Sequence, residues 1–316
     1  MTVPDTLLPT EPFEVLRRKP QQFYLFGEHI SRSKAPFLLN TVFKLLNLDW
    51  KYSLKETSSK HTFNNTFAQE ACIGSAITMP NKVTFVREMD MVDAVGTSVG
   101  AINTVYSRKN SDGTVVRIGT NTDTVGIHQS FLQTPAALTY VEQNHGRPGL
   151  VYGGGGASRS AVYVLHRNFQ CHCVYVVNRD QAEVEALQHH FNTTVPELQV
   201  VHVKTPEEAM RVEPPVLCVL SVPNITPITI DEKLAKATLT SFMHCSRGAV
   251  VEMCYHPVIE TDLYLEFQEA GWEVVGGHVA MMYQGFAQVQ LWGGYQLSEL
   301  PVKEARDILE RHINST

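Results

Sequence analysis

The sequence predicts an α/β protein with two domains, one of them built on a doubly wound parallel sheet. The chain has 316 residues, about twice the length of a typical domain. Short apolar runs alternate with segments of helical spacing, and a run of glycines stands between an apolar run and a helical segment. Apolar residues make up 43% and charged residues 18%, which is typical of a globular protein and not of a disordered one.

The charge and the apolar pattern exclude several classes of protein. The chain has 26 basic and 32 acidic residues, for a net charge of −6. A mildly acidic chain without a cluster of Lys and Arg is a poor candidate for nucleic-acid binding. No apolar run approaches the roughly 20 residues that cross a membrane, and residues 1–22 lack the apolar core of a signal segment. We therefore expect a cytoplasmic enzyme that acts on a small molecule; its oligomeric state stays open.

The six cysteines are expected to be free thiols in a reducing compartment. None forms a CxxC pair. Cys171-His172-Cys173 is not interpreted as a zinc site, because neighbours in a strand point to opposite faces. We predict no metal.

The first part of the chain is expected to mix strands and helices. Gln22–Gly27 is a short apolar run ending in glycine, which is typical of a strand. Apolar residues at helical spacing predict a helix over Ala35–Leu48. The further strands expected here are Asp49–Leu54, Ala71–Thr78, Gly100–Tyr106 and Thr114–Ile118.

The apolar pattern of the second part of the chain predicts repeated strand–helix units. A helix over Asp123–Leu138 and a polar connection over Thr139–Pro148 precede a strand, a glycine loop, a helix and a second strand, which together form a βαβ unit. Those four segments are Gly149–Tyr152, Gly153–Ser158, Arg159–Phe169 and Cys173–Val177. The strands and helices expected after them are Val216–Val222, Gly248–Met253 and Glu273–Val275, with Pro206–Arg211, Asp262–Ala270, His278–Trp292 and Ser298–Ile313.

The glycine loop predicts a dinucleotide-binding site. Glycines let the backbone turn tightly and approach a pyrophosphate, which then lies at the positive end of the following helix. Ser158 stands at the third position of the usual spacing and is small enough for the helix to approach the sheet. A tight turn alone would also explain the glycines, but the strand–loop–helix context favours the nucleotide. The expected cofactor-binding residues are Gly153, Gly155, Gly156, Ala157, Ser158, Asn178, Arg179, Asp180 and Gly277.

The end of the second strand of this unit bears on the choice between NAD and NADP. Asp180 lies about 20 positions beyond the glycines, where an acidic residue binds the ribose 2′-hydroxyl and repels a 2′-phosphate. Arg179 favours the opposite choice, unless it stacks on the adenine ring. Because Asp180 and Glu183 are both negative, NAD is favoured over NADP.

Polar side chains follow several predicted strands of the first part, where open α/β sheets present ligands. Taken singly, Ser33 and Asp123 read as helix N-caps and Lys82 as a solvated surface lysine. Beside a dinucleotide loop, the polar segments together indicate a binding site. They are Ile30–Asn40, Gly74–Lys82, Gly100–Thr104 and Gly119–Gly126.

These motifs, in this order, resemble those of the shikimate/quinate dehydrogenases. The amino-acid sequence of Gly74–Pro80 is most similar to that of fungal quinate dehydrogenases. The similar segments span residues 24 to 294. They are Ser33–Asn40, Ala76–Lys82, Gly100–Thr104, Asn121–Gly126, Gly153–Arg159, Met281–Gly285 and Trp292–Gly294.

The resemblance implies a reversible, NAD-dependent oxidation of the ring C3 hydroxyl of quinate, and of shikimate, with Lys82 and Asp123 as the catalytic pair. A lysine can carry the hydroxyl proton if desolvation lowers its pKa, or if it works with a carboxylate. An ionised Asp123 would raise the lysine pKa, so its main task is expected to be orientation. The residues that the resemblance implies as substrate-binding are Ser33, Thr78, Asn103, Tyr255 and Gln284.

Three positions depart from the family pattern. Ala35 stands where the family has a second Ser or Thr for the carboxylate, Ala76 where it has Asn, and Leu39 where it has His. A smaller residue at position 35 would make room for quinate, which carries one more hydroxyl than shikimate. We hypothesise that Ala35 favours quinate.

The resemblance also implies how the two domains are arranged along the chain. Residues 1–123 are expected to form a substrate domain completed by residues 278–316, and residues 124–277 a Rossmann-like NAD(P) domain. One alternative is a non-catalytic metabolite sensor or regulator, which the presence of Lys82, Asp123 and the glycine loop disfavours. Another is a dehydrogenase for a related cyclitol acid.

Overall fold

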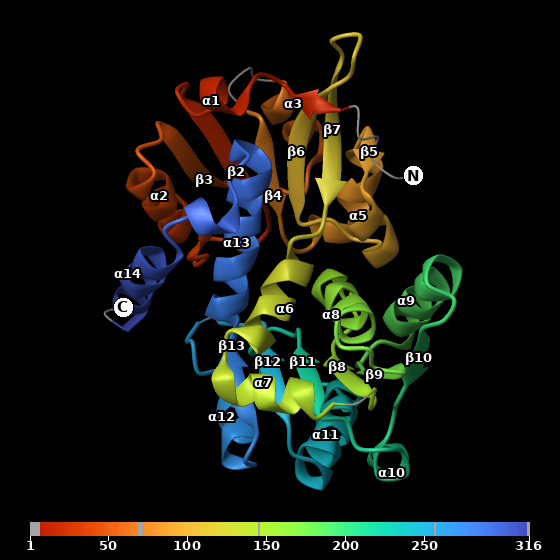
Figure 1. Cartoon of the computed structure of the whole chain (residues 1–316). Coiled ribbons are helices and arrows are strands. Elements are labelled where there is room, and N and C mark those ends of the chain that lie inside the picture. The colour runs from red at the N-terminus through yellow and green to blue at the C-terminus, as the bar shows by residue number, and fades with distance from the viewer. Residues whose placement is uncertain (1–6, 69–71, 145, 256, 315–316) are drawn as a thin grey trace. The chain divides into compact units, whose positions relative to one another are not determined.

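The computed structural model describes residues 7–68, 72–144, 146–255 and 257–314 (Figure 1). Ala71, the expected first residue of one strand, lies outside the described residues, as do the chain ends 1 and 316 of the expected substrate domain. The chain divides into two compact units. The first is Met1–Thr122 with Met281–Thr316, and the second is Asp123–Ala280.

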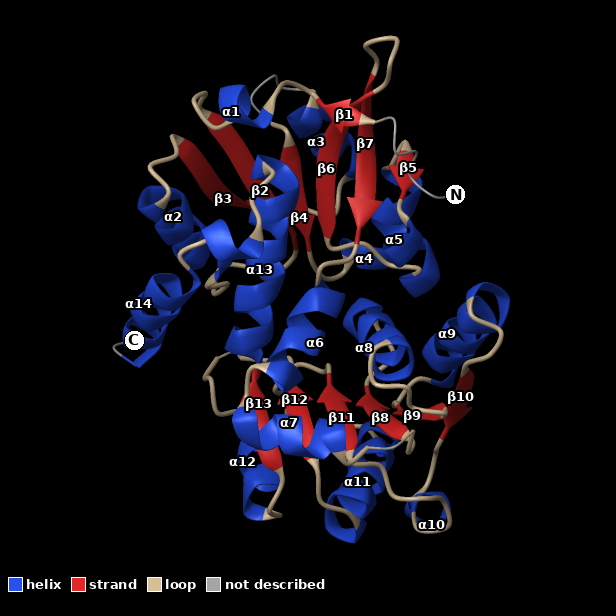
Figure 2. Cartoon of the chain, viewed as in Figure 1, coloured by secondary structure: helices blue, strands red, loops and turns tan. Residues whose placement is uncertain are grey.

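The first unit contains a mixed sheet with the strand order β3-β2-β4-β6-β7-β5, to which β1 adds by pairing with β6 (Figure 2). Strand β2 is parallel to β3 and β4, whereas β6 is antiparallel to β4 and β7. The strands are β1 Leu8–Pro9, β2 Gln21–Gly27, β3 Trp50–Glu56, β4 Gly74–Ile77, β5 Met91–Val92, β6 Thr104–Lys109 and β7 Val115–Thr120.

The pairing register places the ends of three strands side by side at one edge of this sheet. Thr104 at the start of β6 pairs with Ala76 near the end of β4 and with Thr120 at the end of β7. The segments that follow β4 and β7 and the residue that precedes β6 therefore leave the sheet side by side.

Helix α13 adds a large aromatic side chain to the core of the first unit. Trp292 is buried, its ring lies 4.3 Å from that of Phe23, and its Nε1 donates to the Val105 carbonyl at 3.0 Å. A Cβ at Gly74 would lie 2.1 Å from this nitrogen, so the glycine makes room for the indole. The helices that carry residues of this unit are α1 Phe13–Leu16, α2 Ala35–Leu45, α3 Lys60–Phe67, α4 Asn81–Thr84, α5 Ala94–Val99, α13 Gly277–Gly293 and α14 Val302–Asn314.

The second unit confirms the predicted doubly wound sheet. Its strands are all parallel, in the order β10-β9-β8-β11-β12-β13 (Figure 2). The order reverses between β8 and β11, the point at which such sheets bind ligands beyond the carboxyl ends of their strands. The strands are β8 Gly149–Tyr152, β9 Cys173–Val177, β10 Gln199–His202, β11 Leu217–Leu220, β12 Ala249–Glu252 and β13 Glu273–Gly276.

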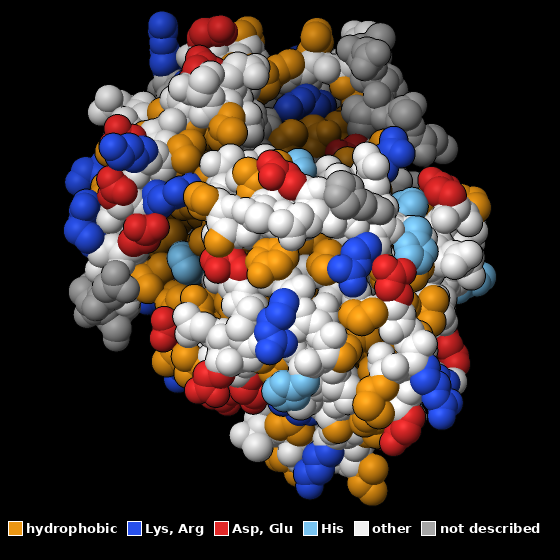
Figure 3. All heavy atoms as spheres, turned by 60° about the horizontal axis from the view of Figure 1, so that its bottom comes forward, with side chains coloured by type: hydrophobic (Ala, Val, Ile, Leu, Met, Phe, Trp, Pro, Cys, Tyr) orange, Lys and Arg blue, Asp and Glu red, His pale blue; other side chains and the backbone are white. Residues whose placement is uncertain are grey.

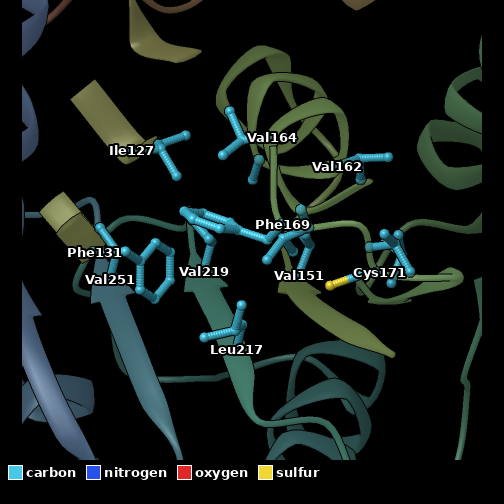
Figure 4. Packing of buried hydrophobic residues seen from close by; sticks show 14 of the residues in the cluster. Ile127, Phe131, Val151, Val162, Val164, Phe169, Cys171, Leu217, Val219 and Val251 are labelled. Atoms are coloured by element: carbon cyan, nitrogen blue, oxygen red, sulfur yellow. The ribbon is translucent and has the colours of Figure 1, made fainter. Parts of the chain in front are cut away.

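Helices cover both faces of this sheet, which explains why the central strands β8, β9 and β11 are apolar and buried throughout. Val151 faces the cluster around α6 and α8, where Phe131 and Phe169 also lie (Figure 4). Leu150 and Tyr152, its neighbours in β8, face the opposite cluster. The helices are α6 Asp123–Leu132, α7 Pro135–Glu142, α8 Gly156–Arg167, α9 Gln181–Thr194, α10 Pro206–Ala209, α11 Ile230–Cys245 and α12 Asp262–Glu269.

Several expected elements differ in their extent: the helix expected over Ala35–Leu48 ends at Leu45, the one expected from Ser298 begins at Val302, and two others differ more. The single helix expected over Asp123–Leu138 is two helices, because Thr134 precedes a proline and is extended, with φ −109° and ψ 107°. Part of the expected connection Thr139–Pro148 is therefore helical. The strand expected from Gly100 begins only at Thr104, since Gly100 has φ 69° and ends α5.

None of the described helices is long and apolar enough to cross a membrane. On the face that Figure 3 draws, basic and acidic side chains are interspersed, and no extended basic patch is visible.

Candidate functional site

The glycine loop between β8 and α8 leaves open space above one of its glycines. Gly153 has φ +125°, which favours glycine. A Cβ at Gly154 would lie 2.5 Å from Asn178 Nδ2. At Gly155, by contrast, a Cβ would meet no atom within 4 Å, and φ is −81°. Neither backbone nor packing requires a glycine at position 155, so the open space above it suits close approach of a ligand.

Ser158 joins α8 to the sheet. Its hydroxyl lies 2.8 Å from the Ser221 hydroxyl, which donates to the Tyr152 carbonyl at 3.0 Å. Ser158 is fully buried. The small residue therefore allows the close approach of helix and sheet that the sequence predicted for this position.

The residues after β9 are held by local hydrogen bonds. Asn178 Nδ2 donates to Glu183 Oε2 at 2.8 Å and to the Asp180 carbonyl at 2.9 Å. Asp180 caps α9, where its Oδ1 accepts from the Ala182 and Glu183 amides. Asp180 thus has a structural role, and the ribose contact predicted for it stays a prediction.

Arg179 is paired with Glu232 at the start of α11, a contact that the sequence analysis missed. Both residues line a cavity of about 620 Å³ beyond the carboxyl ends of β9 and β10. A capping-box pattern, Thr229 followed three residues later by Glu232, was the available signal for this acid. The pattern locates Glu232 at a helix start but does not identify Arg179 as its partner.

Gly277 is the first residue of α13. A Cβ there would lie 2.4 Å from the Met253 carbonyl oxygen and 2.6 Å from that of Glu252. Close packing on the end of β12 is therefore sufficient to explain this glycine, and its predicted contact with a cofactor stays a prediction.

Glu252 organises the loop that carries Tyr255. It is fully buried at the end of β12, and its two carboxyl oxygens accept from the Cys254 amide at 2.8 Å and the Thr261 hydroxyl at 3.3 Å. Burial raises the pKa of Glu252 to about 8. The carboxyl group therefore favours its protonated form at neutral pH. Tyr255 lies three residues after Glu252, directly after Cys254.

In the first unit, the structure brings Asn103 and Gln284 together from opposite ends of the sequence. Asn103 Nδ2 donates to Gln284 Oε1 at 3.0 Å. Asn103 Oδ1 accepts from the Thr122 amide at 2.6 Å and from the Thr104 hydroxyl at 2.9 Å. Two residues predicted to bind substrate thus share one amide network at the sheet edge.

Gln288 belongs to the same network and was missed. It lies one turn beyond Gln284 on α13 and is fully buried, and its Nε2 donates to Gln284 Oε1 and to the Thr104 hydroxyl, both at 3.0 Å. An amide four residues from another amide in an otherwise apolar helix was the signal that could have found it.

Ser33 and Thr78 also follow strands of the first sheet. Ser33 comes after β2, and its hydroxyl accepts from the Ala35 amide at 3.3 Å. Thr78 comes directly after β4, and its amide donates to the Phe26 carbonyl at 2.8 Å. Both side chains are half-buried.

Lys82 and Asp123 belong to different units. Lys82 lies in α4 of the first unit, and its carbonyl accepts from the Ile102 amide at 2.8 Å, so its backbone runs beside the residue that precedes Asn103. Asp123 is buried at the start of α6 and directly follows Thr122 of the amide network. Their action as a catalytic pair stays a prediction.

The departures from the family pattern lie in packed positions. Ala35, Leu39 and Ala76 are all buried. Asn40 ties α2 to β3, since its side chain accepts from the Tyr52 amide and donates to the Tyr52 carbonyl, each at 2.9 Å. Asn40 is therefore a structural residue.

Comparisons with known proteins show which chains this one is similar to. The family described as "Shikimate dehydrogenase substrate binding domain" matches residues 25–105. A quinate dehydrogenase of Emericella nidulans is 34% identical over 308 residues, which cover 92% of this chain and 93% of that protein. A pentafunctional AROM polypeptide of Lachancea thermotolerans is 33% identical over 285 residues, covering 87% of this chain and 17% of the polypeptide.

The solved structures agree with this likeness. The quinate dehydrogenase from Corynebacterium glutamicum in complex with NAD superposes with a TM-score of 0.73, at 20% identity, over 92% of this chain and 99% of that one. At this identity the superposition shows a shared fold.

The open space above Gly155 generates a first prediction. Gly155→Ala should change the free energy of unfolding by less than about 1 kcal/mol, because the added methyl group meets nothing and only the helix cap is altered. The same methyl group should weaken dinucleotide binding by about tenfold, since it stands where the backbone must approach the pyrophosphate. Thermal unfolding and calorimetric titration with NAD⁺ measure the two effects.

Gly154→Ala is the matched control for Gly155→Ala. Its Cβ would clash with Asn178 and Glu183, so it should lower stability as well as affinity. An affinity of Gly155→Ala equal to that of the wild type would contradict the assignment of the loop.

The buried carboxyl of Glu252 generates a second prediction. Its pKa is about 8 in the folded state against an ordinary 4.5, so the folded protein binds the extra proton between these pH values. Stability should therefore fall as pH rises through this range, by about 1.4 kcal/mol per pH unit at most. Glu252→Gln has no carboxyl group to titrate at this position. The free energy of unfolding of the variant, measured in denaturant, should therefore rise relative to that of the wild type from pH 5 to pH 8.

Glu269→Gln, which alters an exposed carboxylate of α12, is the control for the pH experiment. Its difference from the wild type should stay constant over the same range. A constant difference for Glu252→Gln as well would show that Glu252 is ionised in the folded protein.

Proposed function

The chain belongs to the shikimate and quinate dehydrogenase family, and we propose that it catalyses the reversible, NAD-dependent oxidation of the ring C3 hydroxyl of quinate to 3-dehydroquinate. Shikimate, oxidised to 3-dehydroshikimate, is the second substrate of the proposal. The observation that carries it is the amide network of Asn103, Gln284 and Thr122 at the edge of the first sheet, directly before Asp123.

In this proposal the first unit binds the polyol acid. Amides and hydroxyls both donate and accept hydrogen bonds, which is what a ring with several hydroxyl groups needs. Asn103 and Gln284 hold each other in place through the hydrogen bond from Asn103 Nδ2 to Gln284 Oε1. Ser33 and Thr78 of the first unit, with Tyr255 of the second unit, complete the proposed set of substrate-binding residues.

The second unit binds the dinucleotide. Gly153, Gly155, Gly156, Ala157 and Ser158 supply the loop and the helix start that accept the pyrophosphate. When bound, the nicotinamide accepts the hydride that leaves the alcohol carbon.

Lys82 takes the proton of the reacting hydroxyl in this mechanism. As the C–H bond breaks and the hydride departs with its electron pair, the O–H bond breaks toward the lysine amine and the carbonyl forms. Asp123 orients the lysine and the hydroxyl. In the reverse direction, the same lysine returns the proton to the carbonyl oxygen.

NAD is the proposed cofactor in preference to NADP. Arg179, which could bind a 2′-phosphate, is paired with Glu232, and Asp180 adds a second carboxylate beside it. A cytoplasmic location completes the proposal, and the free cysteines of the described chain suit a reducing compartment.

A four-way assay tests the function. Quinate and shikimate, each with NAD⁺ and NADP⁺, are followed at the absorbance band of the reduced nicotinamide, and quinate with NAD⁺ should give the highest kcat/KM. Lys82→Ala should lower kcat by about 100-fold or more while the Kd for NAD⁺ stays within about threefold of the wild type. The proton acceptor is then lost without a change in the nucleotide site.

Lys44→Ala, at an exposed lysine of α2, is the control and should retain full activity. A wild type that is stabilised by quinate but gives no signal with either nucleotide would instead indicate a non-catalytic sensor. Full activity of Lys82→Ala would remove this lysine from the mechanism.

The buried Ala35 generates a prediction about substrate choice. Ala35→Ser adds a hydroxyl at the start of α2, where the proposal assigns space to the additional hydroxyl of quinate. The ratio of kcat/KM for quinate to that for shikimate should fall by about two- to tenfold, the effect of one hydrogen bond. An unchanged ratio would show that position 35 does not select the substrate.

A further inference from the structure

We propose that Glu232 determines the nucleotide preference of the second unit, by neutralising Arg179 and excluding the 2′-phosphate of NADP. The inference rests on the proposed function, because it assumes that a nicotinamide dinucleotide binds beside the glycine loop. It adds a specificity-determining residue that lies outside the glycine loop and outside the segment after β9.

The cavity in which Glu232 lies is placed where the adenosine ribose of a dinucleotide is expected. It has a volume of about 620 Å³ and is bounded by residues that follow β9 and β10 and by the start of α11. In doubly wound sheets the ribose lies beyond the carboxyl end of the strand after the glycine-rich helix, which is β9 here. Residues of this cavity would therefore surround the 2′-position of a bound dinucleotide.

The carboxylate of Glu232 is held in place independently of Arg179. Its Oε2 accepts from the Ile228 amide at 2.8 Å and the Thr229 amide at 2.9 Å, while the Thr229 hydroxyl accepts from the Glu232 amide at 3.2 Å. Its Oε1 accepts from Arg179 Nη1. The backbone amides of Thr229 and Ile228 lower the pKa of Glu232 to about 2, so the group is ionised at physiological pH.

The other charges of the cavity leave little positive potential for a phosphate. The lining contains two cations, Arg179 and Lys204, and the three carboxylates of Asp180, Asp231 and Glu232. A 2′-phosphate carries close to two negative charges at neutral pH and would meet more carboxylates than cations. A neutral ribose hydroxyl meets no such repulsion and can donate to a carboxylate.

His202 and Lys204, which follow the edge of the sheet, do not reverse this balance. Burial lowers the pKa of His202 below its ordinary value, so the imidazole is neutral at physiological pH. Lys204 Nζ donates to Gln181 Oε1 at 3.1 Å. Of the two cations that line the cavity, Arg179 is the one that forms an ion pair with a carboxylate of the same cavity.

The substitution Glu232→Gln tests the inference with little risk to the fold. Glutamine also serves as the second partner of a capping box, so the start of α11 should keep its backbone hydrogen bonds. The charge is lost and Arg179 is released. Calorimetric titration with NAD⁺ and NADP⁺, and with the fragments 5′-AMP and adenosine 2′,5′-bisphosphate, measures binding without relying on turnover.

The variant should bind NADP⁺ and the bisphosphate about tenfold more tightly than the wild type does, with the Kd for NAD⁺ changed by less than about threefold. Arg179→Gln in the Glu232→Gln background should abolish the gain, because the guanidinium is the group that binds the phosphate. Asp231→Asn is the matched control, since it removes a neighbouring carboxylate of the same cavity, and it should change the ratio of the two Kd values by less than threefold.

Three results would overturn the inference. Suppose that the wild type binds NAD⁺ and oxidises quinate, but Glu232→Gln has the same ratio of Kd values for NADP⁺ and NAD⁺ as the wild type. This result refutes the role of Glu232 and leaves the proposed function intact. An equal gain in Asp231→Asn shows that general charge, and not the pair with Arg179, sets the preference. A wild type that binds neither dinucleotide refutes both the inference and the proposed function.

Discussion

The side chain of Asn103 is the interaction on which the organisation of the first unit depends. Its oxygen accepts from the segment that follows β7, its amide nitrogen donates to α13, and its backbone pairs with the ends of β4 and β7. Residues from the beginning, the middle and the end of the chain thus converge on one buried amide. Buried polar groups that lose a partner cost about 1–3 kcal/mol each. A change here would leave several such groups unsatisfied, so the proposed substrate site and the stability of the unit are linked.

Strand–helix periodicity was sufficient to predict the second sheet, because each of its central strands is buried on both faces. The runs at β8 and β9 are apolar throughout and were placed with the correct bounds. Strand β10 and the helices α9 and α11 were missed. They lie at the edge or surface of the unit, and α9 buries only Val184, Leu187 and Phe191, too few apolar residues for a clear pattern. The apolar pattern of a segment reflects how much of it is buried. It therefore predicts a strand or helix less clearly where only one side of that element is buried.

The candidate site was predictable in its motifs but not in its contacts. Asn103 and Gln284 were identified from short motifs, and the structure brings them together. Gln288 and Glu232 were missed, because their significance comes from partners far away in the sequence: Glu232 pairs with Arg179, 53 residues earlier. Asp180 illustrates the opposite limit. An acid after a strand fits both a ribose contact and a helix cap, and local sequence does not distinguish the two uses.

The position of Trp292 has a consequence for synthesis on the ribosome. The indole fills the space above Gly74 and stacks on Phe23, so the core of the first unit needs a residue that is made 269 positions after Phe23. The second unit is contiguous, and all of its strands emerge before α13 does. During translation, in which domains fold as they appear, the later unit therefore acquires a complete core first. The core of the N-terminal sheet stays incomplete around Phe23 until α13, which carries Trp292, leaves the ribosome.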